Sequence, residues 1–308
     1  MKFLKYLLYL LPLILFIVVF TYREHGKNSM ALGSSKNPVK IYFTPSVDAK
    51  DITRTATELL DYLHSETGYY FTSAIPADYV TVVESFGSNK ADIAITNTFS
   101  YLLAHEKFGT EARLRVVRDD GESSYRGQII VRADSGIDSL SDLMSKRIAY
   151  VDPSSTSGYI LPAALLKKHG IVPSDSVFAK KHDFVVSMVY QKQVDAGATY
   201  YSPKDKSGQY RDARERVETQ YPDVYKVVKI IALTDTIPND PVIFRKGLPE
   251  EMKETIVNAM LKYVSTKEGQ ESLHRIYNVE SLIPTSDKDY DPLRALLKQI
   301  NFKISGAL

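Results

Sequence analysis

The sequence of 308 residues contains no cysteine, which excludes disulfide bonds, thiolate metal sites and the acylated cysteine of a bacterial lipoprotein. It also lacks the patterns GxSxG, HExxH, GxxxxGK[ST] and GxGxxG, so no nucleophile elbow, zinc-protease helix or nucleotide-binding loop is indicated. The six histidines show no close pairing that would hold a metal ion. We therefore expect a protein that is not an enzyme and needs no cofactor or metal.

The chain also has no strong net charge of one sign when residues 1–28 are counted separately. The whole chain has a formal net charge of +2, but residues 1–28 alone carry +3, which leaves −1 for the remainder. The charged residues of that segment are Lys2, Lys5, Arg23, Glu24 and Lys27. No basic field remains that would indicate a nucleic-acid partner. Any anion that the protein binds must be held by local groups.

A long apolar run, YLLYLLPLILFIVVFTY, occupies residues 6–22. It is long for the core of a signal peptide and short for a spanning helix, so residues 1–24 are either a signal peptide or an N-terminal membrane anchor. A small-residue sequence at 29–31 lies behind a charged stretch, which favours the uncleaved anchor. Residues 25–37, rich in Gly, Ser and Asn, indicate a tether. Either alternative places the bulk of the chain in the periplasm or another extracytoplasmic space.

Strand and helix patterns alternate in short steps after the tether. Expected strands at 40–44, 69–74 and 91–96 are separated by expected helices at 49–68 and 79–89. The same alternation restarts further along, with expected strands at 126–134, 147–152, 194–200, 227–234 and 241–247. This pattern predicts an α/β fold in which mostly parallel sheets are flanked by helices.

Two similar α/β units predict two lobes. We expect lobe 1 to consist of residues 38–126 and 236–308 and lobe 2 of residues 127–235, with crossings near 127 and 235. Ligands of open α/β sheets bind beyond the carboxyl ends of the strands. The cleft between the lobes is therefore the expected site.

The segment YVDPSSTSGYILPAALLKKHG, residues 150–170, combines a strand end, four consecutive hydroxyl side chains and an apolar helical pattern. The hydroxyl residues are Ser154, Ser155, Thr156 and Ser157, and Gly158 follows them. The first N–H groups of a helix lack intrahelical partners and bear partial positive charge, so an anion can bind there and hydroxyls can add donors. Ordinary helix capping is the alternative. Pro162 leaves the first helical residue uncertain by about two positions.

Two other junctions between strand and helix repeat this composition. Thr44 and Ser46 precede the helix expected from residue 49, and Asn97, Thr98 and Ser100 mark the start of another helix. In one lobe both junctions would open on the same edge of the sheet, which makes Ser46 a candidate ligand contact. Plain caps are again the alternative.

Four segments in order resemble the phosphate-, phosphite- and phosphonate-binding proteins of ABC importers, from about Val39 to Ser272. They are ADYVTVVESFGSNKADIAITNTFSYLLAHEKFG, VDPSSTSGYILP, KKHDFVVSMVYQKQVDAGATY and TDTIPNDPVIFRKGLP. The resemblance implies the two-lobed type II periplasmic binding protein fold and a small phosphorus oxyanion held between the lobes. It also implies an ABC permease and ATPase as the partner of a monomeric binding protein.

The resemblance assigns site residues by position. Ser155, Thr156 and Ser157 match the family's hydroxyl cluster. Tyr79 and Tyr101 match tyrosines that face the ligand, His182 matches a histidine that opens the next helix, and Asp240 matches an acidic position near the hinge. Without the resemblance, the tyrosines could be core residues among 21, His182 a cap and Asp240 a turn residue. An ionised Asp240 facing the ligand would disfavour fully deprotonated sulfate.

One departure from the family bears on the ligand. Members specialised for aminoalkyl phosphonates have an acidic residue shortly after the segment that is GATYYSPKDKSG here. This chain has Tyr200, Tyr201 and Ser202 at that stretch and Asp205 slightly beyond it. We therefore expect phosphate, phosphite or a small unsubstituted phosphonate as the ligand.

Three other functions remain as alternatives. Ser157, His182 and Asp240 could be drawn as a catalytic triad, but no strained nucleophile turn accompanies them. A membrane-tethered extracytoplasmic sensor could use the same two-lobed module and would suit an uncleaved anchor. A relative that binds another small anion or a heterocycle would need the hydroxyl cluster less.

Overall fold

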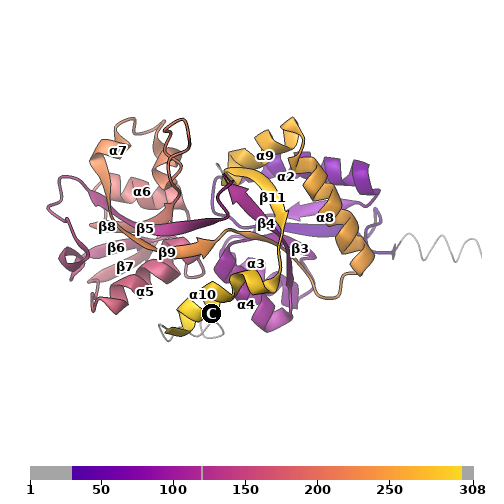
Figure 1. Ribbon diagram of the computed structural model, residues 1–308, viewed down its shortest axis with the longest axis horizontal. Helices are drawn as coiled ribbons and strands as arrows, with labels where there is room; N and C mark the ends of the chain where they lie inside the picture. Colours follow the sequence, from indigo (N-terminus) through magenta and orange to yellow (C-terminus); the bar gives the residue numbers. More distant parts are fainter. Residues whose placement is uncertain (1–29, 119–120, 300–308) are drawn as a thin grey trace, which may run out of the picture.

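The computed structural model describes residues 30–118 and 121–299, which form two α/β lobes lying side by side (Figure 1). Each lobe has its own sheet, and long strands of the second lobe run toward the first. The chain crosses from lobe 1 to lobe 2 between Arg118 and Ser124, and returns between Pro238 and Pro241. The expected two-lobed α/β architecture is confirmed.

Lobe 1 is built on a six-stranded sheet with the strand order β11-β4-β10-β3-β1-β2. Its strands are β1 (Val39–Phe43), β2 (Phe71–Ala74), β3 (Ile93–Ile95), β4 (Glu111–Arg118), β10 (Pro241–Phe244) and β11 (Val279–Pro284). Its helices are α2 (Ala49–Thr67), α3 (Tyr79–Gly87), α4 (Thr98–Phe108), α8 (Glu250–Val264), α9 (Lys267–Tyr277), η5 (Asp287–Tyr290) and α10 (Asp291–Gln299). Helices α2, α8 and α9 contribute to one apolar cluster and α3, α4 and α10 to another.

Lobe 2 is built on a five-stranded sheet with the order β7-β6-β8-β5-β9. Its strands are β5 (Ser124–Arg132), β6 (Arg147–Tyr150), β7 (Asp175–Phe178), β8 (Ala196–Tyr201) and β9 (Val228–Pro238). Its helical segments are η2 (Leu140–Leu143), η3 (Thr156–Ile160), α5 (Leu161–Lys168), α6 (His182–Tyr190), η4 (Ala213–Val217) and α7 (Val224–Val227). Alternate residues of β5 enter two clusters: Ile130 packs with α6, and Ile129 with α5.

The sheets are mixed, which corrects the expectation of mostly parallel sheets. β1 is parallel to β2 and β3, and β6 is parallel to β7 and β8. In contrast, β5 runs antiparallel to β8 and β9, and β10 runs antiparallel to β3 and β4. The two lobe crossings explain the difference, because the outgoing and returning strands β5 and β9 pair with opposite direction and β10 then re-enters the sheet of lobe 1 reversed.

Helix α2 illustrates how local sequence fixes an element. The Asp48 carboxylate accepts the Lys50 N–H and caps the first turn, while Gly68 ends the helix in the left-handed conformation at φ +73°. Ile52 and Leu59 are fully or almost fully buried on one face. The expected helix at 49–68 is therefore confirmed to within one residue.

The described N-terminal residues 30–37 form turns against lobe 1. The Gly33 N–H donates to the Asn37 carbonyl at 2.8 Å, and Leu32 packs against the core that contains α2. The expected signal peptide or anchor at residues 1–24 lies outside the described residues. Within 30–118 and 121–299, no helix has the length and apolar character needed to cross a membrane.

Candidate functional site

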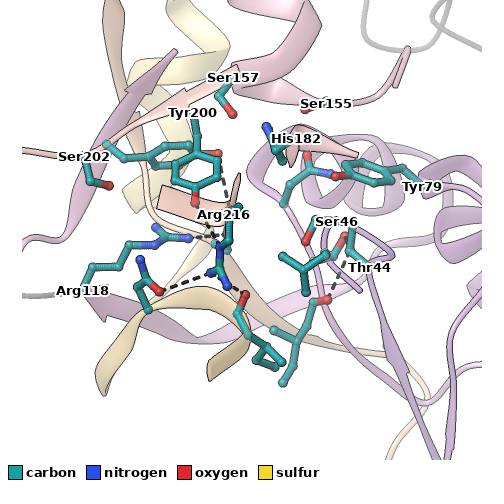
Figure 2. Close-up of a pocket in the computed structure, with 18 residues that line it drawn as sticks. Thr44, Ser46, Tyr79, Arg118, Ser155, Ser157, His182, Tyr200, Ser202 and Arg216 are labelled. Carbon is teal, nitrogen blue, oxygen red and sulfur yellow. Dashed lines mark hydrogen bonds and ion pairs between the residues drawn. The ribbon is translucent and has the colours of Figure 1, made fainter. Parts of the chain in front are cut away.

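A pocket lies between the lobes at the carboxyl ends of parallel strands. Thr44 and Thr96 follow β1 and β3 of lobe 1, whereas Ser155 and Ser202 follow β6 and β8 of lobe 2, and all four line the pocket. Figure 2 shows Ser155 and Ser157 on one side of the pocket, with Arg118 and Arg216 across from them. This is the expected position for a ligand of two open α/β sheets.

The hydroxyl cluster forms the start of a helix in lobe 2. The Oγ atom of Ser155 accepts the Gly158 N–H at 3.1 Å, so Ser155 is the cap. The helix begins with a single π-helical turn, η3, before it continues as α5; such turns are rare and frequent at functional sites. A Cβ atom on Gly158 would come within 2.4 Å of the Val151 side chain, so glycine is required there. The side chains of Ser155 and Ser157 line the pocket.

Two backbone donors of this loop have no acceptor within the described part of the chain. The N–H groups of Ser154 and Ser155 bond to Asp152, and that of Gly158 bonds to Ser155. Among the described residues, the N–H groups of Thr156 and Ser157 find no acceptor within hydrogen-bonding distance. Buried N–H groups are normally paired, and amides without an acceptor at a helix start are well placed to bind an anion; of these two residues, Ser157 lines the pocket.

Thr156 does not line the pocket but bridges the two lobes. Its Oγ1 donates to the Asn97 Oδ1 at 3.0 Å and accepts the Phe99 N–H at 2.9 Å. Asn97 and Phe99 stand at the N-terminus of α4 in lobe 1, where N–H groups lack intrahelical partners. The middle residue of the hydroxyl cluster is therefore used to hold the lobes together.

The N-terminus of a second lobe 1 helix, α3, also contacts lobe 2. The Asp152 carboxylate accepts the backbone N–H of Tyr79, the first residue of α3. The Tyr79 ring lines the pocket and belongs to the apolar cluster of lobe 2 that includes Val151 and Val185. Burial raises the pKa of Asp152. Tyr79 thus lies at the pocket, as expected, and is also part of the contact between lobes.

His182 is the first residue of α6 and lines the pocket. Its Nδ1 lies 2.7 Å from the Thr199 Oγ1, and its ring makes an edge contact with the Tyr200 ring at 4.9 Å. Burial, and then the positive charges of Arg216 and Arg118, lower the pKa of His182 to about 3. The ring is therefore neutral at physiological pH and presents one N–H donor.

Asp240 lines the pocket but is paired. Its Oδ2 accepts from the Arg118 guanidinium at 2.7 Å, and its Oδ1 lies 3.5 Å from the Tyr125 hydroxyl. Burial raises the pKa of Asp240, and the Arg118 charge opposes that shift. The expected acidic residue lines the pocket, but as half of an ion pair with Arg118.

Several pocket residues were missed by the sequence reasoning, among them Arg118, Tyr125 and Arg216. Arg118 ends β4, and Tyr125 lies on the crossing strand β5. Arg216 belongs to the short segment η4 within a polar stretch that has no recognisable motif. Only Arg118 had a recognisable sequence signal, because it ends a segment, EARLRVVR, in which polar and apolar residues alternate as in a strand.

Tyr101 lies away from the pocket, which corrects its assignment. The side chain is fully buried in lobe 1, its hydroxyl donates to Asp287 at 2.6 Å, and its ring makes an edge contact with Tyr290. Tyr101 is one turn into α4, so it faces the core while the start of the helix faces the pocket. Ser46 does line the pocket.

The pocket is enclosed. Ser155 and Ser157 are only 2% and 3% exposed, and the cavity has a volume of about 60 Å³. At roughly 10–15 Å³ for each water-sized sphere, this space holds about four to six such spheres. A tetrahedral oxyanion with five non-hydrogen atoms has that size. The described residues contain no group of three or more His, Asp or Glu that could hold a metal ion.

Two lobes closed over a small pocket with unclaimed donors define a solute-binding protein, and comparison with known proteins agrees. The chain belongs to the periplasmic substrate-binding proteins of phosphonate ABC transporters, because that family's sequence profile matches residues 41–290. The protein is the substrate-binding component of such a transporter. It pairs with a permease and ATPase, and it lies in the periplasm or another extracytoplasmic space. These relatives bind and deliver substrate, which supports a protein that is not an enzyme and does not favour the tethered-sensor alternative.

Two curated relatives show the extent of the sequence similarity. The phosphonates-binding periplasmic protein of Escherichia coli K12 is 28% identical over 247 residues, covering 78% of this chain and 70% of its own. The phosphate-import protein PhnD of Mycolicibacterium smegmatis is 26% identical, covering 81% and 82%.

The structures share the fold. A binding protein of a phosphonate ABC transporter from Pseudomonas aeruginosa superposes with a TM-score of 0.75 at 23% identity, covering 86% of this chain and 87% of that one. PhnD1 of Prochlorococcus marinus, solved with methylphosphonate, gives 0.71 at 16% identity, covering 85% and 98%.

Proposed function

We propose that the protein binds phosphate, phosphite or a small unsubstituted phosphonate in the closed pocket between its lobes and delivers it to the permease. The observation that carries this proposal is the start of η3, where the Ser157 amide has no acceptor among the described residues and lies beside the buried hydroxyls of the pocket residues Ser155 and Ser157. These groups offer neutral donors to one small oxyanion. Methylphosphonate in a relative with the same fold and phosphate in the name of another support this ligand class.

The cavity volume supports a compact ligand. Phosphate, phosphite and methylphosphonate have four or five non-hydrogen atoms and match a space of about 60 Å³. In contrast, 2-aminoethylphosphonate has seven and carries an ammonium group. Tyr200 and Ser202 line the pocket in the region where an acidic partner for that ammonium would be needed.

Asp240 supports discrimination against sulfate. The pocket combines one carboxylate with a paired guanidinium, so a ligand that carries a proton can donate to Asp240, whereas sulfate cannot. Replacing Asp240 with Asn removes the repulsion, and the ratio of sulfate affinity to phosphate affinity should rise. Sulfate binding as tightly as phosphate in the unmodified protein would remove this part of the proposal.

The division of the chain into lobes is part of the same proposal. We place residues 38–126 and 236–308 in lobe 1 and residues 127–235 in lobe 2. Tyr125 and Ile237, at the ends of the crossing strands β5 and β9, pack in an apolar cluster that is formed mainly by lobe 1 and also includes Ile160 and Leu161 of lobe 2, which supports boundaries near them. Residues 1–24 then act as a signal peptide or anchor, and the tether of residues 25–37 leads into lobe 1.

A thermal-shift panel tests the ligand class. The purified protein is heated with phosphate, phosphite, methylphosphonate, 2-aminoethylphosphonate or sulfate, each at the same concentration. A ligand that binds the native state raises the unfolding temperature. We expect at least one of the first three to raise it clearly more than sulfate does. No shift with any phosphorus compound would refute the proposed function.

A further inference from the structure

Arg216 reaches from lobe 2 to lobe 1 across the edge of the pocket. Its guanidinium donates to the carbonyls of Arg275 and Ile276, each at 3.1 Å, and to the Asn278 Oδ1 at 3.2 Å. On its own lobe, its Nε donates to the Tyr200 hydroxyl at 3.3 Å. Figure 2 shows the side chain extending into the centre of the pocket region.

The acceptors on lobe 1 are the C-terminal end of α9. Asn278 ends that helix in the left-handed conformation, and the last carbonyls of a helix have no intrahelical donors. They also form the negative end of the helix dipole, which a cation stabilises. Arg216 therefore caps a helix of the opposite lobe, and it can do so only when the lobes are closed.

The charge of Arg216 has no direct ionic partner in the described part of the chain. Its four acceptors are two carbonyls, one amide oxygen and one hydroxyl, all neutral. Glu215 is bonded to Arg211 instead, and Asp183 acts on Arg216 only from beyond ion-pair distance. Burial disfavours the Arg216 charge, but Tyr200 and Glu215 keep its pKa raised, so the guanidinium stays charged.

The other arginines nearby are different. Arg118 is paired with Asp240 at 2.7 Å, and Arg214 with Asp212 at 2.8 Å. His182 is neutral. Among the residues that the structure describes, Arg216 therefore lines the pocket without a carboxylate in contact, and burial of an ion is costly unless an opposite charge compensates it. An anion placed against the hydroxyl cluster supplies that charge.

We propose that Arg216 makes closure of the lobes depend on the negative charge of the ligand and so determines selection against ligands that carry an ammonium group. This inference rests on the proposed function and identifies Arg216 as the residue that makes binding depend on ligand charge. Closing without ligand leaves the Arg216 guanidinium in contact with neutral groups, with Glu215 and Asp183 acting only from a distance, whereas closing on an anion adds a negative charge inside the pocket that it lines. An ammonium substituent adds a second cation to the same enclosed space. The free energy of closure on such a ligand is therefore less favourable.

The test compares two phosphonates on four proteins. Arg216→Gln removes the charge and keeps an amide donor for the α9 carbonyls, and Arg216→Lys keeps the charge. Arg147→Gln is the matched control, because Arg147 is an exposed lobe 2 arginine paired with Asp195, outside the pocket. Calorimetry gives the dissociation constants of methylphosphonate and 2-aminoethylphosphonate for each protein, and small-angle scattering reports closure.

We expect Arg216→Gln to weaken methylphosphonate binding by roughly 10- to 100-fold, the loss of one charge-assisted contact. The weakening of 2-aminoethylphosphonate binding should be at least about fivefold smaller. The ratio of the 2-aminoethylphosphonate dissociation constant to that of methylphosphonate should therefore fall. Arg216→Lys and Arg147→Gln should keep the ratio of the unmodified protein. Ligand-free Arg216→Gln should also be more compact than the ligand-free unmodified protein.

The contrary outcomes are distinct. If Arg216→Gln weakens both ligands by the same factor, or changes neither, the inference is wrong and the proposed function stands. If the unmodified protein binds no phosphate, phosphite or phosphonate, the proposed function is wrong and the inference fails with it. Unfolding melts of each variant show whether a lost affinity comes from a lost fold.

Discussion

The two sides of the pocket are built from different chemistry and encoded differently. The hydroxyl side is one continuous segment in which Ser155, Ser157 and two amides lie within one turn of a helix. The guanidinium side is assembled from Arg118 and Arg216, which are far apart in the sequence but line the same pocket. Neutral donors can be recognised as a motif, whereas the charge that complements the ligand arises from tertiary structure.

The largest effect should come from removing the hydroxyl side. Ser155→Ala combined with Ser157→Ala deletes two donors in an enclosed cavity, and each loss should cost about 1–3 kcal/mol of binding free energy. Calorimetric titration with phosphate and methylphosphonate measures the loss. Ser176→Ala, an exposed serine of β7 in the same lobe, is the control and should bind normally. Unchanged dissociation constants for the double variant would show that the anion lies elsewhere.

His182 lies between the two sides and should make stability depend on pH. Its pKa is about 3 in the folded protein and about 6.5 in the unfolded chain, so below pH 6.5 the unfolded state binds the proton first. The free energy of unfolding should therefore fall as the pH drops from about 6.5 toward 3, by up to about 1.4 kcal/mol per pH unit.

Urea unfolding of the ligand-free protein at pH 7.5 and pH 5 measures this effect, with His182→Gln as the comparison. The unmodified protein should lose about 2 kcal/mol more than the variant over that interval. Equal losses in the two proteins would mean that His182 is not shielded from protonation by burial and by the two arginines.

Thr156 should act on closure rather than on direct ligand contact. Thr156→Val keeps the shape of the side chain but removes the bonds to Asn97 and to the Phe99 N–H, at a cost of about 1–2 kcal/mol. A double-mutant cycle with Asn97→Ala isolates the bridge, and we expect a coupling of about 0.5–1.5 kcal/mol in methylphosphonate affinity. Additive effects would remove Thr156 from the interlobe contact.

Tyr101 should have the smallest effect on binding. Tyr101→Phe removes the hydroxyl that bonds to Asp287, which should cost about 0.5–1.5 kcal/mol of folding stability. The dissociation constant for methylphosphonate should stay within about twofold of the unmodified value, since this position is outside the pocket. Tyr79→Phe provides the comparison on a tyrosine that does line it. A large loss of affinity in Tyr101→Phe would restore the original assignment.

Local signals in the sequence were sufficient for elements that depend on a single segment. The α2 helix and the hydroxyl turn could be predicted because caps, periodicity and glycine act within a few residues. The alternation of Ala112, Leu114 and Val116 also indicates a strand, although β4 is not among the strands expected above.

Other features needed the tertiary structure. β10 is antiparallel because of the path between lobes, and nothing within its own four residues specifies direction. Tyr101 and Tyr79 occupy similar positions near the starts of α4 and α3, and only packing decides that one faces the core and the other the pocket. Arg216 could not be identified because its acceptors lie about 60 residues away on another lobe.

The most direct test of the account is the amide NMR spectrum of the protein as methylphosphonate is added. The N–H group of the pocket residue Ser157 has no acceptor among the described residues and should gain one from the ligand, so its proton signal should move strongly downfield in step with saturation. If calorimetry shows saturation while this signal stays in place, the helix start is not the anion site and the account is wrong.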